Sequence, residues 1–340
     1  MLHSKKRVFI TGATGFVGAW TTRALLHAGH DVHALMLEGA AEDALAKERL
    51  GADSAITPIR GDFLRPSSYL PAVEALKPDV CIHLAWYANP KDYLSSRINL
   101  ELLDATIKLG TKLIDIGCPR FVAAGTCFEY DTSWPGYLAE DAPLSPRHLY
   151  STCKRALFDI LTNLTHGTAT SFAWPRLFFL YGEHEAKGRL VPAVIDALLG
   201  SEPARVTTGE QVRDYMHVGD AGRAIAHIAT NAPVTGPINV ATGEPVPVRK
   251  LIETIATIMQ KPDQVAWGAI EARPNDPAFI CANVEKLEAT GFRPQSTLEQ
   301  GLAATISAAT KKHLLAQGAS QVTEGTSTSR SESGSESGAA

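Results

Sequence analysis

The chain has 340 residues, of which 45% are hydrophobic and 20% charged, so it can bury a full core in one large domain or two of ordinary size. Its formal net charge of -4 gives no reason to expect nucleic acid, whose binding depends on many Lys and Arg contacts to phosphate. No apolar run approaches the roughly 20 residues that cross a bilayer, and the N-terminus has no signal-peptide core. We therefore expect a cytoplasmic protein that binds a small molecule, without nucleic-acid or membrane function.

Cysteine and histidine usage excludes two further kinds of site. The five cysteines are odd in number and widely spaced, which suits neither a disulfide framework nor a zinc site. The eleven histidines form no cluster with metal-ligand spacing. We therefore expect a reducing compartment and no bound metal.

The first half of the chain alternates short apolar runs with helical patterns. Buried strands are predicted at residues 7–10, 31–37, 80–84, 121–124 and 171–174. This alternation predicts an α/β protein with a Rossmann-like, doubly wound parallel sheet covered by helices on both faces. We assign residues 1–181 to this nucleotide-binding domain and expect residues 236–243 to return to its sheet.

The second half changes character after Gly182. Helices are predicted over residues 192–199, 220–230, 249–259 and 298–315, separated by short loops rich in Gly and Pro. These features predict a smaller, mostly helical substrate domain that is discontinuous, over residues 182–235 and 244–317. From 318 to 340 the composition falls to Gly, Ser, Thr, Glu and Ala, which predicts a disordered tail.

A glycine-rich loop, TGATGFVG at 11–18, follows the first strand and opens a helix. Gly12 permits the tight turn, Gly15 lets the backbone approach a pyrophosphate, and Gly18 allows the helix to pack against the sheet. The other loop residues predicted to contact the dinucleotide are Thr14, Phe16 and Val17. The spacing G-x-x-G-x-x-G differs by one residue from the common dinucleotide fingerprint and is typical of the short-chain dehydrogenase/reductase class.

The end of the second strand gives little information about which dinucleotide is bound. An acid there binds the adenosine ribose, whereas a base accommodates a 2′-phosphate. Met36 and Leu37 occupy these positions, Glu38 is the nearest acid, and no Arg or Lys is close in sequence. The sequence leaves NAD and NADP open and favours NAD; Glu38 is read equally as a ribose ligand or as a solvated loop residue.

A tyrosine and a lysine stand four residues apart in the stretch YSTCK at 150–154. On a helix this spacing places Tyr150 and Lys154 on one face. A phenol of pKa about 10 transfers protons poorly at neutral pH, but a neighbouring ammonium lowers that pKa. The pair is predicted to be a general acid and base for a carbinol or ketone. Upstream, Thr126 follows the strand 121–124 at the carboxyl edge of the sheet, where its hydroxyl is expected to bind the substrate oxygen.

These motifs resemble the extended short-chain dehydrogenase/reductase family, which includes epimerases, dehydratases and ketoreductases of sugar nucleotides. The resemblance spans about residues 7–305. Further segments match in order: GD at 61–62, HLA at 83–85, INL at 98–100, RLFFLYG at 176–182, RDYMHVGD at 213–220, NVATG at 239–243 and RPND at 273–276. It implies an NAD(P)-dependent enzyme that acts on a nucleoside-diphosphate sugar. It also implies a homodimer formed through helices near residues 99–110 and 150–164.

The resemblance assigns roles to individual residues. Those implied to contact the cofactor, besides the glycine loop, are Asp62, Phe63, Leu84, Ala85, Asn99 and Lys154. Arg213 and Arg273 are implied to hold the substrate diphosphate, since each guanidinium offers a planar fork of donors to phosphate oxygens. From the residues alone, Arg213 is also read as a local ion pair with Asp214.

Two departures from the family narrow the chemistry. The 4,6-dehydratases carry Asp-Glu after the threonine, whereas this chain has Cys127 and Phe128, and Glu129 is one residue too far along to substitute simply. Cys127 is read as a small buried hydrophobe. Phe179 stands where the family usually has an asparagine that contacts the sugar or phosphate. With Trp86 and Phe128 expected nearby, Phe179 predicts an apolar substrate site suited to a deoxygenated hexose.

Two enzymatic functions use this same set of residues. We prefer a 4-ketoreductase of a nucleoside-diphosphate 4-keto-6-deoxyhexose, which consumes exogenous reduced cofactor. The alternative is a 4-epimerase with tightly bound NAD, which removes and returns the same hydride. A non-catalytic, cofactor-binding regulator on the same fold is a third possibility, against which stand the retained Thr126, Tyr150 and Lys154.

Overall fold

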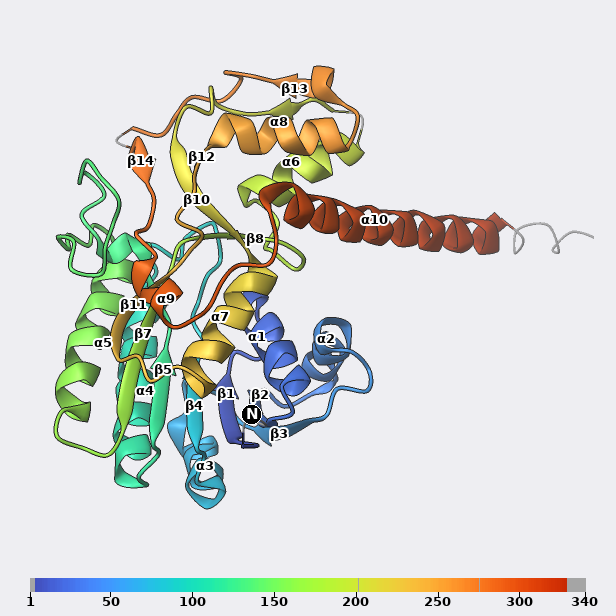
Figure 1. Ribbon diagram of the computed structural model, residues 1–340. Helices are drawn as coiled ribbons and strands as arrows, with labels where there is room; N and C mark the ends of the chain where they lie inside the picture. The colour runs from blue at the N-terminus through green and yellow to red at the C-terminus, as the bar shows by residue number, and fades with distance from the viewer. Residues whose placement is uncertain (1–3, 201, 275, 329–340) are drawn as a thin grey trace, which may run out of the picture.

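The dominant feature of the fold is one parallel sheet of eight strands (Figure 1). The computed structural model describes residues 4–200, 202–274 and 276–328, and the burial of side chains up to residue 317. The strands are ordered β11-β7-β5-β4-β1-β2-β3, with β6 beside β7. Their bounds are β1 Arg7–Thr11, β2 Asp31–Met36, β3 Ile56–Arg60, β4 Val80–His83, β5 Arg120–Ala123, β6 Gly125–Thr126, β7 Ser171–Leu177 and β11 Gly236–Val240. The predicted Rossmann-like sheet is confirmed.

Helices cover both faces of this sheet, which explains why its central strands β1 and β4 are buried at every position except Arg7. One apolar cluster lies between the sheet and helices α1 and α7, and another lies between the sheet and helices α3, α4 and α5. The helices of this domain are α1 Phe16–His27, α2 Ala40–Leu50, α3 Leu70–Leu76, α4 Ile98–Asp115, α5 Leu149–Thr165 and α7 Val218–Thr230, with short 3-10 turns η1 Pro66–Ser68 and η2 Cys127–Glu129.

Helix α7 packs on this larger domain, although the sequence reading placed residues 182–235 in the substrate domain. The close contact with α1 depends on Gly222, where an added Cβ would come within 2.7 Å of the Thr21 backbone nitrogen. The chain enters the second domain at β8 Phe179–Tyr181, returns through α7 and β11, and leaves again at β12 Pro245–Pro247. The pairing of β11 with β7 agrees with the expected return of this segment to the sheet.

The smaller domain contains sheets as well as helices, so its predicted, mostly helical composition is incomplete. Strands β12, β10, β14 and β8 form one sheet, and β9 and β13 pair in another. The remaining bounds are α6 Leu190–Leu199, β9 Ala204–Arg205, β10 Val212–His217, α8 Val248–Ile258, η3 Pro262–Gln264, β13 Val265–Ala266, β14 Phe279–Ile280, α9 Glu285–Ala289 and α10 Leu298–Thr328. These strands are short, and β10 buries Arg213 and Asp214, so their sequences lack the apolar alternation that predicts a strand.

The last helix differs from the tail expected over 318–340. Helix α10 continues to Thr328 and projects from the body (Figure 1). Its end extends a helix that is already formed, so it needs no new nucleation. Residues 329–340 lie outside the described residues. Within the described residues, no helix is long and apolar enough to cross a membrane, and the five cysteines are free and buried.

Candidate functional site

The glycine loop between β1 and α1 leaves no room for side chains at two of its glycines. Gly12 has φ +73, and an added Cβ would lie 2.7 Å from the Ala85 backbone nitrogen. A Cβ on Gly18 would lie 1.8 Å from the Gly12 carbonyl oxygen, whereas one on Gly15 would stand 3.1 Å from that oxygen. The Gly15 N–H donates to the same oxygen at 2.9 Å, which closes the turn. The loop therefore presents bare backbone to a ligand.

The N-terminus of α1 is built to receive an anion. Gly15 caps the helix without a side-chain hydrogen bond, and the first turn contains no acidic residue. The positive end of the helix therefore faces the loop, an arrangement that suits a pyrophosphate. The Thr14 hydroxyl instead donates to Glu42 at 2.7 Å, and Arg49 donates to the Thr14 carbonyl at 2.7 Å. Thus Glu42 and Arg49 of α2 fix the position of the predicted ligand Thr14.

The other predicted cofactor residues border this loop in different ways. Leu84 and Ala85 follow β4 and are half-buried, and the Leu84 N–H donates to the Thr11 carbonyl at 3.1 Å. Asp62 follows β3, is half-exposed, and forms an ion pair with Arg65 at 3.3 Å. Phe63 turns inward instead, where its ring stacks on that of His83 at 4.7 Å between centroids. Phe63 therefore offers the cofactor groove only its backbone.

One base near the end of the second strand was missed by the sequence reading. Arg60, at the end of β3, donates to the Leu37 carbonyl at 3.0 Å and to the Asp43 carboxylate at 2.6 Å. Strand pairing brings it there, since Arg60 stands opposite Met36 in the parallel register. Its ion pair with Asp43 already occupies the guanidinium. Glu38, the nearest acid, is exposed.

Lys154 is buried on α5 beneath an aromatic ring. Its ammonium donates to the Ala124 carbonyl at 2.9 Å and lies 3.6 Å from the centroid of the Trp86 ring. Burial lowers the pKa of Lys154 to about 7, and the negative charge of Glu129 opposes that shift. The lysine is thus poised to gain or lose a proton near neutral pH.

Tyr150, on the same helix, lies among aromatic rings and beside Thr126. Its ring makes edge contacts with Tyr93 at 5.2 Å and Trp86 at 6.4 Å between centroids. The sequence reading expected Lys154 to lower the pKa of Tyr150. In the structure burial raises that pKa, and the opposing influence is a hydrogen bond with Thr126. The reason is that the lysine ammonium is directed at the Ala124 carbonyl and the Trp86 ring.

Thr126 completes the predicted catalytic set. It ends β6 and begins η2, and its hydroxyl accepts from the Phe128 N–H at 3.3 Å. The structure brings Thr126, Tyr150 and Lys154 together at the carboxyl edge of the sheet, as the motifs predicted, because β6 pairs in parallel with β7 beside the start of α5.

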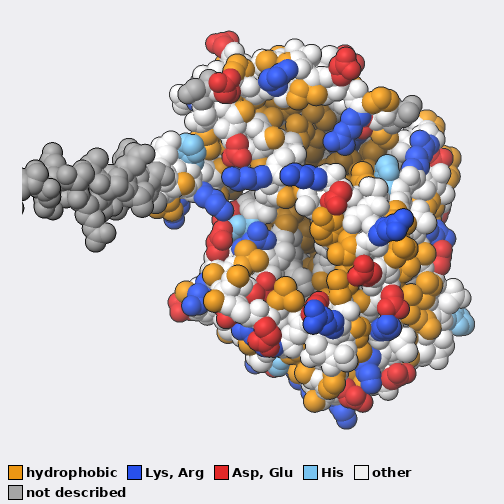
Figure 2. All heavy atoms as spheres, turned by 180° about the vertical axis from the view of Figure 1, so that it is seen from behind, with side chains coloured by type: hydrophobic (Ala, Val, Ile, Leu, Met, Phe, Trp, Pro, Cys, Tyr) orange, Lys and Arg blue, Asp and Glu red, His pale blue; other side chains and the backbone are white. Residues whose placement is uncertain are grey.

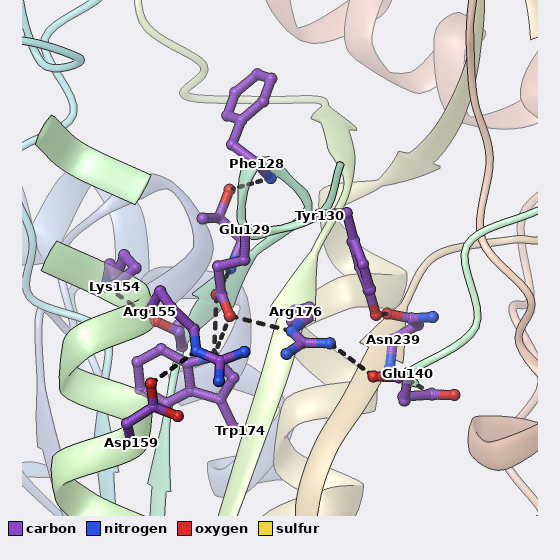
Figure 3. Close-up of polar contacts among 12 residues, drawn as sticks. Phe128, Glu129, Tyr130, Glu140, Lys154, Arg155, Asp159, Trp174, Arg176 and Asn239 are labelled. Atoms are coloured by element: carbon purple, nitrogen blue, oxygen red, sulfur yellow. Dashed lines mark hydrogen bonds and ion pairs between the residues drawn. The ribbon is translucent and has the colours of Figure 1, made fainter. Parts of the chain in front are cut away.

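A buried carboxylate behind Thr126 was not foreseen as part of the site (Figure 3). Glu129 accepts from the Thr126 N–H at 2.8 Å, the Trp174 indole at 3.0 Å and the Arg176 guanidinium at 3.1 Å. Burial raises the pKa of Glu129, while Arg176 and these donors lower it. The carboxylate thereby fixes the backbone that carries the catalytic threonine. The sequence carried one signal of this network: Trp174 and Arg176 stand two residues apart on β7, which places both side chains on one face of the strand.

The same network continues toward the second domain. The Arg176 guanidinium lies 4.6 Å from the Tyr130 ring centroid and donates to the Glu140 carbonyl at 3.0 Å. The Tyr130 hydroxyl donates to Asn239 at 2.7 Å, and the Asn239 amide donates to the Leu138 carbonyl at 2.7 Å. These links join β7, β11 and the loop after η2, so the catalytic edge is held rigidly.

The predicted substrate residues form an aromatic wall on the side of the second domain. The Phe128 and Phe179 rings meet edge to face at 6.1 Å, and the Tyr215 ring lies 6.0 Å from that of Phe179. The Arg213 guanidinium stands 5.4 Å from the Phe179 centroid. In Figure 2, which views the molecule from behind, hydrophobic side chains gather in a hollow between the two domains. The wall offers few polar groups to a sugar.

The two arginines expected to hold the diphosphate differ in their surroundings. Arg213 is buried, and its guanidinium pairs with Asp276 at 2.8 Å and donates to the Pro277 carbonyl at 2.7 Å. Asp214, the local partner considered from the sequence, instead accepts from Thr242 and Gly243. Arg273 is exposed, on the same loop as Asp276. The structure thus buries Arg213 beside the wall and leaves Arg273 exposed.

Trp86 and Asn99 act as a pair. Asn99 is fully buried, accepts from the Trp86 indole at 2.8 Å and donates to the Tyr93 and Ser96 carbonyls at 2.8 Å each. Both N–H donors of the amide are therefore engaged within the protein. Trp86, predicted to line the substrate site, lies over Lys154 and beside the Tyr150 ring.

This arrangement of a glycine loop and a Thr, Tyr and Lys centre coincides with a match to a known family. Residues 8–241 match the model of the NAD dependent epimerase/dehydratase family. The chain belongs to this family. Because of this membership, the chain is an enzyme that uses NAD, in agreement with the preference for NAD drawn from the sequence. Its relatives modify sugar nucleotides.

Individual relatives cover between 72% and 91% of the chain. CDP-abequose synthase of Salmonella typhimurium is 27% identical over 312 residues, which cover 89% of this chain and 98% of that protein. dTDP-6-deoxy-L-talose 4-dehydrogenase (NAD(+)) of Aggregatibacter actinomycetemcomitans is 22% identical over 248 residues, covering 72% and 88% of the two chains. UDP-N-acetylglucosamine 4-epimerase of Methanobrevibacter ruminantium M1, solved with UDP-N-acetylmuramic acid, has a TM-score of 0.79 at 22% identity and covers 91% and 99%. The last likeness establishes the fold.

Proposed function

We propose that this NAD-dependent sugar-nucleotide enzyme is a 4-ketoreductase of a nucleoside-diphosphate 4-keto-6-deoxyhexose. The observation that carries the proposal is the pairing of an intact Thr126, Tyr150 and Lys154 centre with the Phe128 and Phe179 rings, which offer no acid or base to a leaving hydroxyl. One relative supports the reaction type by its name, since a 4-dehydrogenase of a 6-deoxy sugar nucleotide, run in reverse, is a 4-ketoreductase.

The residues fit the cofactor that the family uses. The Gly12 and Gly18 positions admit no Cβ, and the uncapped N-terminus of α1 faces the loop, so the loop suits a pyrophosphate. The groups proposed to hold the cofactor are Gly12, Thr14, Gly15, Phe16, Val17, Gly18, Asp62, Leu84, Ala85 and Lys154, with Phe63 acting through its backbone and Asn99 through Trp86. When bound, the reduced cofactor supplies the hydride that adds to the ketone carbon.

The chain itself supplies the proton and the positioning. Tyr150 donates its phenolic proton to the ketone oxygen, which becomes the 4-hydroxyl, and the phenolate is reprotonated from solvent. Thr126 hydrogen-bonds the same oxygen, and Glu129 holds the Thr126 backbone in place. The Lys154 ammonium, held by the Ala124 carbonyl and the Trp86 ring, is proposed to act on the cofactor and not on the pKa of Tyr150. Phe128, Phe179 and Trp86 exclude water, while Arg213 and Arg273 bind the diphosphate.

Dehydration is disfavoured because the positions that would protonate a leaving hydroxyl are chemically inert. Cys127 is buried, and burial raises the pKa of its thiol to about 12. Phe128 has no proton to give, and Glu129 is occupied by Trp174 and Arg176. A 4-epimerase with tightly bound NAD remains the second candidate, supported by the structural likeness to a 4-epimerase.

A homodimer through α4 and α5 is proposed on similar grounds. These two helices pack side by side on one face of the sheet (Figure 1), and they expose Leu100 and Leu164. In such a dimer, α4 and α5 would pack against the partner subunit and bury both leucines there.

The decisive experiment incubates the purified protein with NADH and a panel of CDP-, dTDP- and UDP-linked 4-keto-6-deoxyhexoses, and follows the absorbance of the reduced nicotinamide. Stoichiometric loss of NADH with formation of a 4-hydroxyl sugar is the expected result. A parallel incubation without NADH also includes UDP-glucose. There, a product formed without net change in the cofactor would instead establish a 4-epimerase. Equal NADH loss with Tyr150→Phe would overturn the proposed chemistry.

A further inference from the structure

The loop between β8 and α6 carries a carboxyl group that the proposed mechanism does not use. The Oε2 atom of Glu185 is buried and has no hydrogen-bond partner among the described residues. The loop at this point is a tight turn, since the Glu185 N–H donates to the Gly182 carbonyl at 3.2 Å. Buried polar atoms in folded proteins are normally paired. A partner supplied by a bound ligand would satisfy this oxygen.

The loop that carries Glu185 runs between the aromatic wall and Tyr150. It follows β8, whose Phe179 stands opposite Tyr215 of β10 and packs against its ring. At its other end, the Arg189 N–H donates to the Ala186 carbonyl at 3.2 Å, and the Arg189 guanidinium lies 4.8 Å from the Tyr93 ring centroid. The Tyr93 ring in turn lies 5.2 Å from that of Tyr150. Glu185 therefore stands on the segment that joins the wall to the reacting centre.

We propose that Glu185 is a sugar-recognition residue, whose carboxyl hydrogen-bonds an oxygen of the hexose while the diphosphate is held elsewhere. The proposal rests on the proposed function, because it takes a nucleoside-diphosphate sugar as the ligand. In this role Glu185 gives the apolar wall one polar contact. A single hydrogen bond in an apolar site contributes strongly to specificity, because its loss leaves a buried group unpaired.

The protonation state of this carboxyl fits an uncharged sugar. Burial raises the pKa of Glu185 to about 8, although the charge of Arg189 and the Gly182 turn oppose the shift. Arg189 on its own loop acts on the carboxyl through its charge, and Glu185 in turn acts on Tyr215 of β10, whose pKa is itself raised by burial. At neutral pH the carboxyl is therefore protonated and donates a hydrogen bond as well as accepting one. Above pH 8 it loses the donor.

The test compares binding of sugar nucleotides with binding of the free diphosphates. Calorimetric titrations use CDP-, dTDP- and UDP-glucose beside CDP, dTDP and UDP, on wild type, Glu185→Leu and Glu185→Gln, at about pH 7 and 9. We expect Glu185→Leu to weaken sugar-nucleotide binding about tenfold or more at pH 7 and to leave diphosphate binding nearly unchanged. Glu185→Gln, which keeps a donor, should bind like wild type at pH 7 and lack the wild-type loss of affinity at pH 9. Glu183→Gln, whose carboxylate faces Arg23 and His184, is the matched control on the same loop.

Each other outcome has a distinct meaning. In one outcome, wild type binds the diphosphates and the sugar nucleotides, and Glu185→Leu binds the sugar nucleotides equally well. This result would overturn the role of Glu185 and leave the proposed function standing. Equal weakening of diphosphates and sugar nucleotides in Glu185→Leu would also overturn it, because the carboxyl would then support the loop and not the sugar. Wild type that binds no sugar nucleotide would overturn both proposals.

Discussion

The ammonium of Lys154 lies 3.6 Å from the centroid of the Trp86 ring, and the indole of Trp86 is in turn fixed by Asn99. A cation over an indole face is stabilised by the ring quadrupole, especially where water is excluded. Three segments of the sequence that looked like separate motifs therefore form one unit. This unit keeps the lysine buried, and the burial lowers its pKa although the indole face favours the cation.

Lysine burial predicts a specific dependence of stability on pH. An unfolded lysine keeps its proton to about pH 10.4, whereas the pKa of Lys154 is lowered to about 7. Between these values the folded chain binds fewer protons than the unfolded chain, so this residue makes stability rise with pH. Lys154→Met removes the effect. Urea unfolding of the cofactor-free protein at about pH 6, 8 and 9.5 should show the wild type gaining on the variant as pH rises, by at most about 1.4 kcal/mol per pH unit.

Lys108→Met is the control for that measurement, since Lys108 is exposed on α4 beside Asp104. Its difference from wild type should not change across the same pH range. A wild-type advantage over Lys154→Met that stayed constant with pH would mean that Lys154 titrates normally.

Catalysis should depend on Tyr150 more than on Thr126. Tyr150→Phe removes one oxygen and leaves the contacts with Tyr93 and Trp86 in place, so folding and NAD affinity should be nearly preserved while kcat falls about 100- to 10,000-fold. Thr126→Val should cost less. Steady-state kinetics of both single variants and the double variant, on the substrate found in the panel, form the required cycle.

The double variant distinguishes two ways in which the hydroxyls can act. If the two hydroxyls work as one unit, the double variant will be barely slower than Tyr150→Phe alone. If they act independently, the losses in kcat of the two single variants will multiply. Most activity retained in Tyr150→Phe would require another proton donor.

The buried pair Glu129 and Arg176 should be costly to break. Both side chains are at most 1% exposed, so removal of one leaves an uncompensated buried charge. We expect Arg176→Met to lower the free energy of unfolding by about 3 to 5 kcal/mol. The double variant Glu129→Gln with Arg176→Met should lose less than the sum of the single variants, because neither charge is then left alone. Chemical denaturation at neutral pH measures all three; strict additivity would argue against a direct pair.

The glycine loop makes a prediction about cofactor binding. In Gly18→Ala the new Cβ would stand 1.8 Å from the Gly12 carbonyl oxygen, so the turn must open. We expect loss of NAD binding by at least about tenfold, because the backbone donors no longer face the pyrophosphate. Gly136→Ala, whose Cβ would meet only the Trp134 indole at 3.6 Å, is the control and should bind normally. Fluorescence titration with NADH would compare the two, and equal affinities would remove the loop from the cofactor site.

The C-terminal segment should be dispensable for the core enzyme. The sequence from 318 to 340 is polar and of low complexity, and the helix that enters it projects from the body (Figure 1). Removal of residues 318–340 should leave both Tm and activity unchanged. A clear fall in either value, measured by thermal scanning and by the NADH assay, would mean that this segment contacts the rest of the protein.

The sequence by itself determined the parts of this protein that depend on local order. The strand that precedes Gly12, the helix that follows Gly15 and the four-residue spacing of Tyr150 and Lys154 are each encoded within one short segment. Parallel strands then deliver their carboxyl ends to one edge, so the nearness of Thr126 to these groups also followed from the pattern. Helical periodicity likewise predicted α6, α7, α8 and the start of α10.

Only the tertiary structure decided which partner each polar side chain finds. Glu129 meets Arg176 across the 47 residues that separate them, and Arg213 meets Asp276 across 63. Such pairings depend on how elements distant in sequence pack, and periodicity carries no information about them. The same reason explains why the burial of Lys154 under Trp86, the raised pKa of Tyr150 and the unpaired oxygen of Glu185 could not be read from the sequence. Short strands such as β10 were missed because their charged residues become compatible with burial only once these partners are in place.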